Sequence, residues 1–244
     1  MRRILVTGGA GFIGSNFIRH MLKTHPEDQI FVLDDLTYAG NLSNFEDETF
    51  RSRNFFFWKG NVCDRPTVER FVSQVDQIVH FAAETHVDNS IYNTDDFVDT
   101  DVKGTQILLD AVRRNPVERF IQISTSEVYG TAETEPMTEE HPLNPRSPYA
   151  SAKTGADRLA YSYHITFDTP IIILRPFNNY GPRQHVEKLI PCFITRALRN
   201  LRLPMHGDGS SSRDWVFVDD CARAVDLALQ ADLREVKGQV INVG

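Results

Sequence analysis

Short apolar runs alternate along this chain with longer stretches that have helical periodicity. The apolar runs have the length of buried strands and cover residues 4–6, 29–33, 54–58, 77–81, 119–124, 171–174 and 239–243. After the first run, Phe17, Ile18, Met21 and Leu22 recur at helical spacing. The same periodicity predicts helices over residues 66–73, 98–114, 147–163, 187–199 and from about 220 onward. We expect Asp64 to cap the helix at 66–73.

Alternation of strands and helices predicts an α/β fold, a doubly wound parallel sheet with right-handed crossovers. Residues 131–148 contain four prolines and several acids, so we expect an irregular loop there. The pattern is less regular after residue 182, and residues 206–213 read as a polar loop. We therefore predict a dinucleotide-binding domain over 1–182 and a smaller substrate lobe with the last strand over 183–244. Because the chain stops directly after a strand, we expect this lobe to be incomplete.

A glycine-rich turn, Thr-Gly-Gly-Ala-Gly-Phe-Ile-Gly at residues 7–14, joins the first strand to the first helix. Glycines permit a tight turn and let backbone N–H groups approach a pyrophosphate at the helix N-terminus. The second strand ends in Asp34 and Asp35, and Asp34 lies twenty positions beyond Gly14. An acid there accepts a hydrogen bond from an adenosine ribose and repels a 2′-phosphate. The sequence thus favours NAD over NADP as cofactor.

Composition narrows the class of partner. The net charge of −7 argues against nucleic acid, which requires a basic face. No stretch is long and apolar enough to span a membrane, and the first strand begins too early for a signal peptide, so we expect a cytoplasmic protein.

Cys63, Cys192 and Cys221 form no CxxC pair and are expected to be buried free thiols. The eight histidines lack metal-ligand spacing, so no metal is predicted.

Tyr149 and Lys153 are four residues apart, on one face of a predicted helix. A phenol has a pKa near ~10, which a nearby ammonium and a nicotinamide cation are expected to lower. Alone, the two residues would read as an ordinary helical pair. Thr125 and Glu127 follow the fifth strand, and together with the glycine turn they favour a catalytic group. Glu127 is either a solvated turn carboxylate or a base for a C–H made acidic by a neighbouring ketone.

These features resemble the extended short-chain dehydrogenase/reductases, which have a Rossmann-type fold. Within that group the chain is most similar to the nucleotide-sugar 4,6-dehydratases, especially the dTDP-glucose type. The matching motifs extend over essentially the whole chain, at residues 36–41, 82–88, 127–130, 178–182, 187–191 and 213–215.

The resemblance implies a lyase that retains NAD and converts a sugar nucleotide to its 4-keto-6-deoxy form. Tyr149 would take the 4-OH proton as hydride leaves C4, with Thr125 bonded to the 4-oxygen and Lys153 to the nicotinamide ribose. Glu127 would remove the C5 proton as the C6 hydroxyl departs, and hydride would return to C6. The family also commonly forms homodimers through two long helices, here near residues 97–114 and 149–165.

The resemblance also assigns binding residues. Those implied for NAD are Gly8, Gly11, Phe12, Ile13, Gly14, Asp34, Asp35, Thr37, Gly40, Asn61, Val62, Ala82, Ala83, Thr85, Thr100, Tyr149 and Lys153. Those implied for the sugar nucleotide are His86, Thr125, Asn178, Lys188, Leu189 and Arg213. Arg213 suits a diphosphate through its planar fork, and the alternative is a surface arginine paired with Asp208 or Asp214.

Two positions depart from the dTDP-glucose pattern. Ser126 stands where those enzymes carry an Asp that protonates the leaving hydroxyl, so a serine there is expected to act only as a proton relay. The sequence Thr-Ser-Glu at this place resembles GDP-mannose 4,6-dehydratases and UDP-glucuronate decarboxylases. Asn61 stands where relatives have an Asp near adenine, and its amide still offers an acceptor to the adenine amine.

Three functions remain open from sequence. The leading one is a 4,6-dehydratase, because Glu127 lies beside the Tyr149/Lys153 pair. A UDP-sugar 4-epimerase or UDP-glucuronate decarboxylase begins with the same oxidation at C4 on the same scaffold. A non-catalytic dinucleotide-binding module is the third, because this fold hosts many functions.

Overall fold

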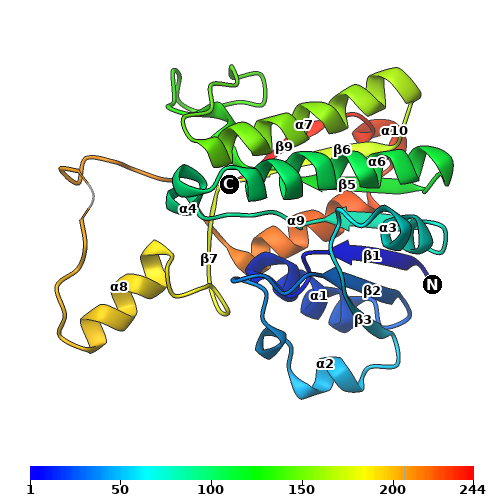
Figure 1. Ribbon diagram of the computed structural model, residues 1–244, viewed down its shortest axis with the longest axis horizontal. Coiled ribbons are helices and arrows are strands. Elements are labelled where there is room, and N and C mark those ends of the chain that lie inside the picture. Colours follow the sequence, from blue (N-terminus) through cyan, green and yellow to red (C-terminus); the bar gives the residue numbers. More distant parts are fainter. Residues whose placement is uncertain (206) are drawn as a thin grey trace.

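A seven-stranded parallel sheet forms the centre of the molecule (Figure 1). The computed structural model describes residues 1–205 and 207–244, so His206 of the expected polar loop lies outside the described residues. The strand order is β3-β2-β1-β4-β5-β6-β9. The strands are β1 (Arg3–Thr7), β2 (Gln29–Asp34), β3 (Phe55–Lys59), β4 (Gln77–His80), β5 (Arg119–Ile123), β6 (Ile171–Pro176) and β9 (Val240–Val243). The predicted doubly wound sheet is confirmed, with strand bounds within two residues of those expected.

Helices cover both faces of the sheet, which explains why its strands read as continuous apolar runs. Ile4, Leu5 and Val6 of β1, for example, are fully buried although they point to alternate faces. On one face lie α1 (Phe12–Thr24) and α9 (Val218–Gln230). On the other lie α3 (Arg65–Val72), α6 (Thr105–Arg114) and α7 (Pro148–Phe167). Each face has its own hydrophobic core.

Two local predictions need correction. The expected helix over 98–114 is divided, because η2 (Val98–Gly104) has π-helical hydrogen bonding and α6 begins only at Thr105. Asp64 is the N-cap residue of α3, but its carboxylate accepts the hydroxyl of Thr67 and makes no bond to a helix amide. The side chain of Asp64 therefore does not cap the helix in the expected way.

Short elements connect the main ones. They are η1 (Leu42–Asn44), α2 (Asp47–Arg51), α4 (Val87–Tyr92), α5 (Asp95–Phe97), η3 (Ser126–Tyr129) and α10 (Leu233–Val236). The proline-rich stretch before α7 is irregular, as predicted. Among the described residues, no helix is long and apolar enough to cross a membrane. Of the three free cysteines only Cys221 is buried, so the expectation of buried thiols does not hold for Cys63 and Cys192.

The segment after β6 leaves the body of the molecule and then returns to it. Strands β7 (Asn178–Tyr180) and β8 (Trp215–Phe217) pair in parallel as a separate two-stranded sheet. Between them α8 (Leu189–Leu198) projects away from the sheet (Figure 1), and none of its residues is buried. Chain beyond β8 then supplies α9, which packs on α1, and β9, which pairs with β6.

An ion pair is buried where β5, β6 and α7 meet. The Arg175 guanidinium donates from Nε to Asp157 Oδ2 at 2.9 Å and from Nη2 to Oδ1 at 3.0 Å. Both residues are inaccessible, with exposed fractions of 1% and 0%. Burial opposes ionisation of Asp157, but the hydrogen bonds and charge of Arg175 hold the pKa of Asp157 below its usual range. A hydroxyl from Ser124 also donates to Asp157 Oδ2, at 2.7 Å.

We predict that Arg175→Met lowers the free energy of unfolding by about 3 kcal/mol. The substitution removes two buried hydrogen bonds to Asp157 and leaves the partly exposed Arg158 as its remaining cationic partner. Urea unfolding followed by circular dichroism measures the change. Arg223→Met is the matched control, since its pair with Asp220 is exposed and should matter little. A loss for Arg175→Met as small as that of the control would contradict the prediction.

Candidate functional site

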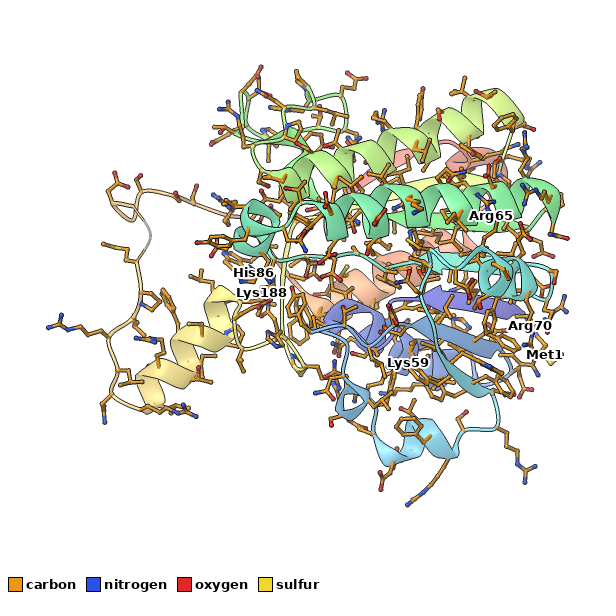
Figure 2. The ribbon with its side chains drawn as sticks, viewed as in Figure 1. Met1, Lys59, Arg65, Arg70, His86 and Lys188 are labelled. Carbon is orange, nitrogen blue, oxygen red and sulfur yellow. The ribbon has the colours of Figure 1, made fainter. Side chains whose placement is uncertain are left out.

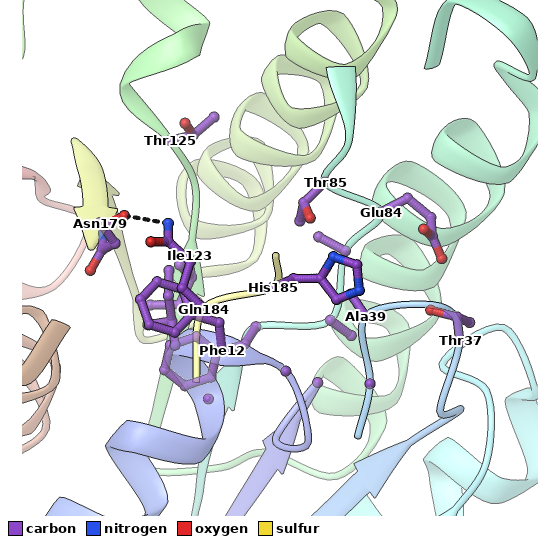
Figure 3. A pocket seen from close by; sticks show the side chains of 18 of the residues that line it. Phe12, Thr37, Ala39, Glu84, Thr85, Ile123, Thr125, Asn179, Gln184 and His185 are labelled. Atoms are coloured by element: carbon purple, nitrogen blue, oxygen red, sulfur yellow. Dashed lines mark hydrogen bonds between the residues drawn. The ribbon is translucent and has the colours of Figure 1, made fainter. Parts of the chain in front are cut away.

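A cavity of about 760 Å³ opens at the carboxyl ends of the parallel strands. It lies beside the switch in strand order between β1 and β4, where ligands bind in sheets of this kind. Figure 3 shows Thr125 and Asn179 on one side of the cavity and Glu84 and Thr37 on the other, with Phe12 below. Every residue that the sequence analysis assigned to the cofactor lines this cavity.

The glycine turn between β1 and α1 forms one wall. Gly8 has φ +69°, and a Cβ atom there would lie 2.5 Å from the backbone nitrogen of Ala82. A Cβ atom at Gly14 would collide with the carbonyl of Gly8. The cap residue of α1 is Gly11, which has no side chain to bond the first-turn amides. The wall therefore presents free N–H groups and a helix N-terminus, a combination that fits a pyrophosphate.

Asp34 braces this turn from the end of β2. Its Oδ2 accepts the N–H of Ala10 at 2.8 Å, and its Oδ1 accepts the N–H of Leu36 at 2.8 Å. Burial raises the pKa of Asp34, and these two backbone bonds oppose the rise. The carboxylate predicted to bind ribose thus also fixes the loop around the cavity.

Asp35 and Asn61 form a second polar pair in the same wall. The Asn61 amide nitrogen donates to Asp35 Oδ2 at 2.8 Å, and its oxygen accepts the N–H of Cys63 at 2.7 Å. The oxygen that the sequence analysis expected to be offered to adenine already accepts a backbone bond. Oδ2 of Asp35 accepts the bond from Asn61, so Oδ1 is the Asp35 atom that faces this part of the cavity without that bond.

Thr125, Ser126 and Glu127 follow β5 directly. Thr125 is the N-cap of η3, and its hydroxyl oxygen accepts the N–H of Glu127 at 3.2 Å. Thr125 and Glu127 both line the cavity, whereas Ser126 is not among the lining residues. The short helical turn thus directs the two flanking side chains inward.

Tyr149 enters the cavity from the first turn of α7. Ser147 caps that helix by accepting the N–H of Ala150 at 3.0 Å, and Pro148 occupies the first turn. Burial raises the pKa of Tyr149, and the charge of Asp101 raises it further, while a hydrogen bond with Thr125 opposes the rise. In the chain without the nicotinamide cation, the pKa of Tyr149 is therefore raised, because the loss of water outweighs the polar contacts. The lowered pKa expected beside that cation stays a prediction.

Lys153 lies one turn further along α7 and is almost fully buried. Its ammonium donates to the backbone oxygen of Ile123, at the end of β5, at 2.8 Å. Burial lowers the pKa of Lys153, and the carboxylates of Asp101 and Asp157 oppose this. The ammonium is thus fixed at the carboxyl end of the central strand.

The residues assigned to the substrate divide into two groups. Asn178, Lys188 and Leu189 line the cavity. The Lys188 ammonium donates to the backbone oxygen of Thr85 at 3.0 Å, and burial lowers the pKa of Lys188. Figure 2 shows His86 and Lys188 together at the junction between the body and α8. His86 is not a lining residue, and its Nδ1 accepts the N–H of Asn89 at 3.2 Å.

Arg213 lies outside the cavity. It is exposed, and its guanidinium donates to the backbone oxygen of Ser212 at 2.7 Å. Within the described residues it pairs with neither Asp208 nor Asp214, the two partners considered from sequence. Arg213 is therefore not brought together with the other residues assigned to the sugar nucleotide.

Several lining residues carry no assignment from sequence. Burial raises the pKa of Glu84, while a hydrogen bond with Thr37 opposes the rise. Gln184, His185 and Glu187 reach the cavity from the segment before α8. Glu84 and Glu187 lie inside matched motifs and were accessible from sequence, whereas Gln184 and His185 follow a proline and have no periodic signal.

Comparison with known proteins agrees with this geometry. The family model for GDP-mannose 4,6-dehydratase matches residues 5–244. The low-salt glycan biosynthesis protein Agl12 of Haloferax volcanii is 49% identical, over 99% of this chain and 76% of that protein. Among solved structures, one is similar that shows a double mutant of DesIV, a dTDP-glucose 4,6-dehydratase from Streptomyces venezuelae, with NAD bound. Its sequence is 44% identical, and it superposes with a TM-score of 0.94 over 100% of this chain and 76% of that one.

An epimerase is also similar. The UDP-glucuronic acid 4-epimerase of Bacillus cereus, in complex with UDP-glucuronic acid and NAD, has a TM-score of 0.93 and 32% identity, over 99% of this chain and 77% of that one. The chain thus spans about three quarters of the length of these relatives. The family model covers nearly all of this chain and the sheet, glycine turn and cavity agree with it, so the protein belongs to the GDP-mannose 4,6-dehydratase family of extended short-chain dehydrogenase/reductases.

Proposed function

We propose that this protein is a nucleotide-sugar 4,6-dehydratase of the dTDP-glucose type that works with retained NAD. The supporting observation is that Thr125, Glu127, Tyr149 and Lys153 share one cavity with the glycine turn. In that cavity Tyr149 is the candidate base for the sugar O–H, and Glu127 is the candidate base for a C–H. The glycine turn is the candidate binding site for the dinucleotide. Elimination of water beside a transient ketone requires all three.

The cavity fits NAD by its own chemistry. The open amides of the first turn of α1 would hold the pyrophosphate, and Asp34 and Asp35 would face the adenosine ribose. NAD supplies removal of a hydride from one carbon and its later return to another. Lys153 would hold the nicotinamide ribose from the end of β5.

Tyr149 and Thr125 would handle the sugar 4-oxygen. The Thr125 hydroxyl donates a hydrogen bond to it while the Tyr149 phenolate accepts its proton. Because burial raises the pKa of Tyr149, the phenolate needs positive charge close by, and the Lys153 ammonium supplies it. The 4-ketone left behind makes the C5 hydrogen acidic.

Glu127 would then remove the C5 proton, and the C6 hydroxyl would leave as water with the proton that Tyr149 took from the 4-OH. As hydride returns to C6, Glu127 would give its proton back to C5. Ser126 lies outside the cavity lining, so in this proposal it at most relays the proton that the departing hydroxyl takes up. Asn178, Lys188 and Leu189 would hold the nucleotide diphosphate near α8. A basic side chain such as Lys188 suits that anionic group.

We also propose that the protein is a homodimer that associates through the segment formed by η2 and α6 and through α7. Large apolar side chains on this side of the molecule are exposed, among them Val98 at 48%, Ile165 at 64% and Phe167 at 45%. Exposed apolar groups on neighbouring helices favour association with a second apolar surface.

A second candidate activity is 4-epimerisation or decarboxylation of a UDP-sugar. Ser126 favours it, because a serine follows Thr125 where the dTDP-glucose enzymes carry an acid. The likeness to a UDP-glucuronic acid 4-epimerase supports it as well. These reactions share the oxidation at C4 and differ in the bond broken afterwards.

We predict that the protein, incubated without added NAD with dTDP-glucose, GDP-mannose, UDP-N-acetylglucosamine or UDP-glucuronate, removes one water from a single substrate. Mass spectrometry of the products measures this. Loss of CO2 from UDP-glucuronate, or a product that differs only in configuration at C4, would replace the dehydratase with the second candidate. No turnover of any substrate would favour a dinucleotide-binding module.

Glu127→Gln should reduce kcat for water loss by at least about 100-fold, because an amide cannot accept the C5 proton. Substrate affinity, measured by isothermal titration calorimetry, should change by less than about threefold. Glu133→Gln, an exposed carboxylate in the loop after η3, is the control and should leave kcat unchanged. Equal losses of rate and affinity in Glu127→Gln would assign Glu127 to binding.

Asp35→Asn should weaken discrimination against a 2′-phosphate while leaving the backbone bonds of Asp34 intact. Removing one charge from the cavity wall corresponds to roughly 1 kcal/mol, or about fivefold, in the ratio of NADP to NAD affinity. Calorimetric titration with each dinucleotide gives the ratio. Asp47→Asn, an exposed residue of α2, serves as control, and an unchanged ratio in Asp35→Asn would rule out this role.

A further inference from the structure

Asp101 is a buried acid with half of its carboxylate unpartnered. It lies in the π-helical segment η2, with an exposed fraction of 1%. Its Oδ1 accepts the N–H of Glu84 at 2.9 Å, and its Oδ2 has no hydrogen-bond partner in the part of the chain that the structure describes. A carboxylate in this condition is costly unless a positive charge lies close to it.

Lys153 provides that charge. Helix α7 packs directly on η2, and the Lys153 ammonium uses one N–H on the oxygen of Ile123. An ammonium has three donors, and the hydrogen bond to Ile123 uses one of them. Lys153 and Asp101 make no direct ion pair within 4.0 Å in the described residues, so the charge of Lys153 acts on Asp101 across a short buried gap. The opposite charges of the two residues act on each other in both directions.

Within the described residues, other ionisable groups adjoin Asp101. Tyr149 faces it from α7 and Glu84 from the segment after β4. His80 on β4 connects to it through Thr105, whose hydroxyl donates to the Asp101 backbone oxygen at 2.5 Å and lies 3.0 Å from His80 Nε2. Burial lowers the pKa of His80 to about 3, so His80 is neutral and adds no charge.

A purely structural role does not account for a charged residue here. Among the described residues, the one hydrogen bond of the Asp101 side chain is from the Glu84 N–H, and the amide oxygen of an asparagine would accept that bond equally well. What an asparagine lacks is the negative charge beside Lys153 and Tyr149.

We propose that Asp101 is the counter-ion of Lys153 and sets the protonation of the Tyr149/Lys153 pair. It acts through Lys153 and is therefore a positioning residue. The consequence for catalysis rests on the function proposed above, whereas the pairing itself does not.

The charge of Asp101 raises the pKa of both Tyr149 and Lys153. Burial in turn raises the pKa of Asp101 from 3.8 to about 7, with Lys153 opposing the rise. Because the pKa of Asp101 is higher in the folded than in the unfolded state, the contribution of Asp101 to the stability of the fold is greatest at low pH, where Asp101 is protonated. That advantage is lost as pH rises from about 4 to about 7.

The first experiment compares melting temperatures of wild type and Asp101→Asn between pH 4 and pH 9. The variant should gain several degrees over wild type as pH rises to about 7 and then hold a constant lead. In a Lys153→Met background the lead should continue to grow above pH 7, because the ionised acid has lost its partner. Asp99→Asn, an exposed acid of the same segment, is the control and should show no such trend.

The second experiment measures kcat/KM against pH for the same proteins on the substrate that the screen identifies. Loss of the Asp101 charge should move both limbs of the Asp101→Asn profile to lower pH by about one unit, because the pKa values of Tyr149 and Lys153 both fall. A loss of rate that is equal at every pH would mark a merely structural residue.

Three results would overturn the proposal: a pH-independent difference in melting temperature, the same trend with and without Lys153, or unmoved limbs in an active Asp101→Asn enzyme. If Asp101→Asn does not fold, Lys153→Met alone decides, since its stability should keep falling above pH 7. The melting measurements need no substrate. They therefore test the pairing even if every sugar nucleotide is left unchanged.

Discussion

The buried pair of Asp157 and Arg175 holds together the part of the molecule on which the candidate chemistry depends. Asp157 lies one turn beyond Lys153 on α7, and Ser124, which donates to it, directly precedes Thr125. Arg175 continues the network, because its Nη1 donates to the hydroxyl of Tyr129, which in turn donates to Asn242 of β9. One ion pair therefore fixes α7 and the ends of β5, β6 and β9. Tyr149 and Thr125 can meet only if those four elements keep their positions.

The two ends of the cavity are built differently. At the dinucleotide end, the loop that forms the wall is fixed before a ligand arrives, because Asp34 accepts hydrogen bonds from the backbone N–H groups of Ala10 and Leu36. At the end toward α8, side chains such as Lys188 and Leu189 come from a segment without a core of its own. Preorganisation is thus concentrated where the proposed cofactor binds, and the substrate end relies on a more exposed scaffold.

Most of the fold was predictable because it follows from local periodicity. Apolar runs bounded by glycine, aspartate or proline gave all seven strands of the main sheet, and the spacing from Gly14 to Asp34 placed both residues at one cavity. The β7–β8 sheet was missed because three-residue strands are too short to show a period. Asp101 was missed because a π-helical turn changes which side chains face inward. The burial that raises the pKa of Tyr149 in the chain alone was also not foreseen, because burial is a tertiary property that sequence spacing does not carry.

The pairing of β7 with β8 has an evolutionary consequence. It brings together the two ends of the excursion that contains α8, so the length of that excursion hardly affects the sheet behind it. Each doubling of a flexible loop costs only about 0.6 kcal/mol. Insertions and deletions between the two strands should therefore cost little stability, so this part of the chain can change in length while the strands beneath keep their register.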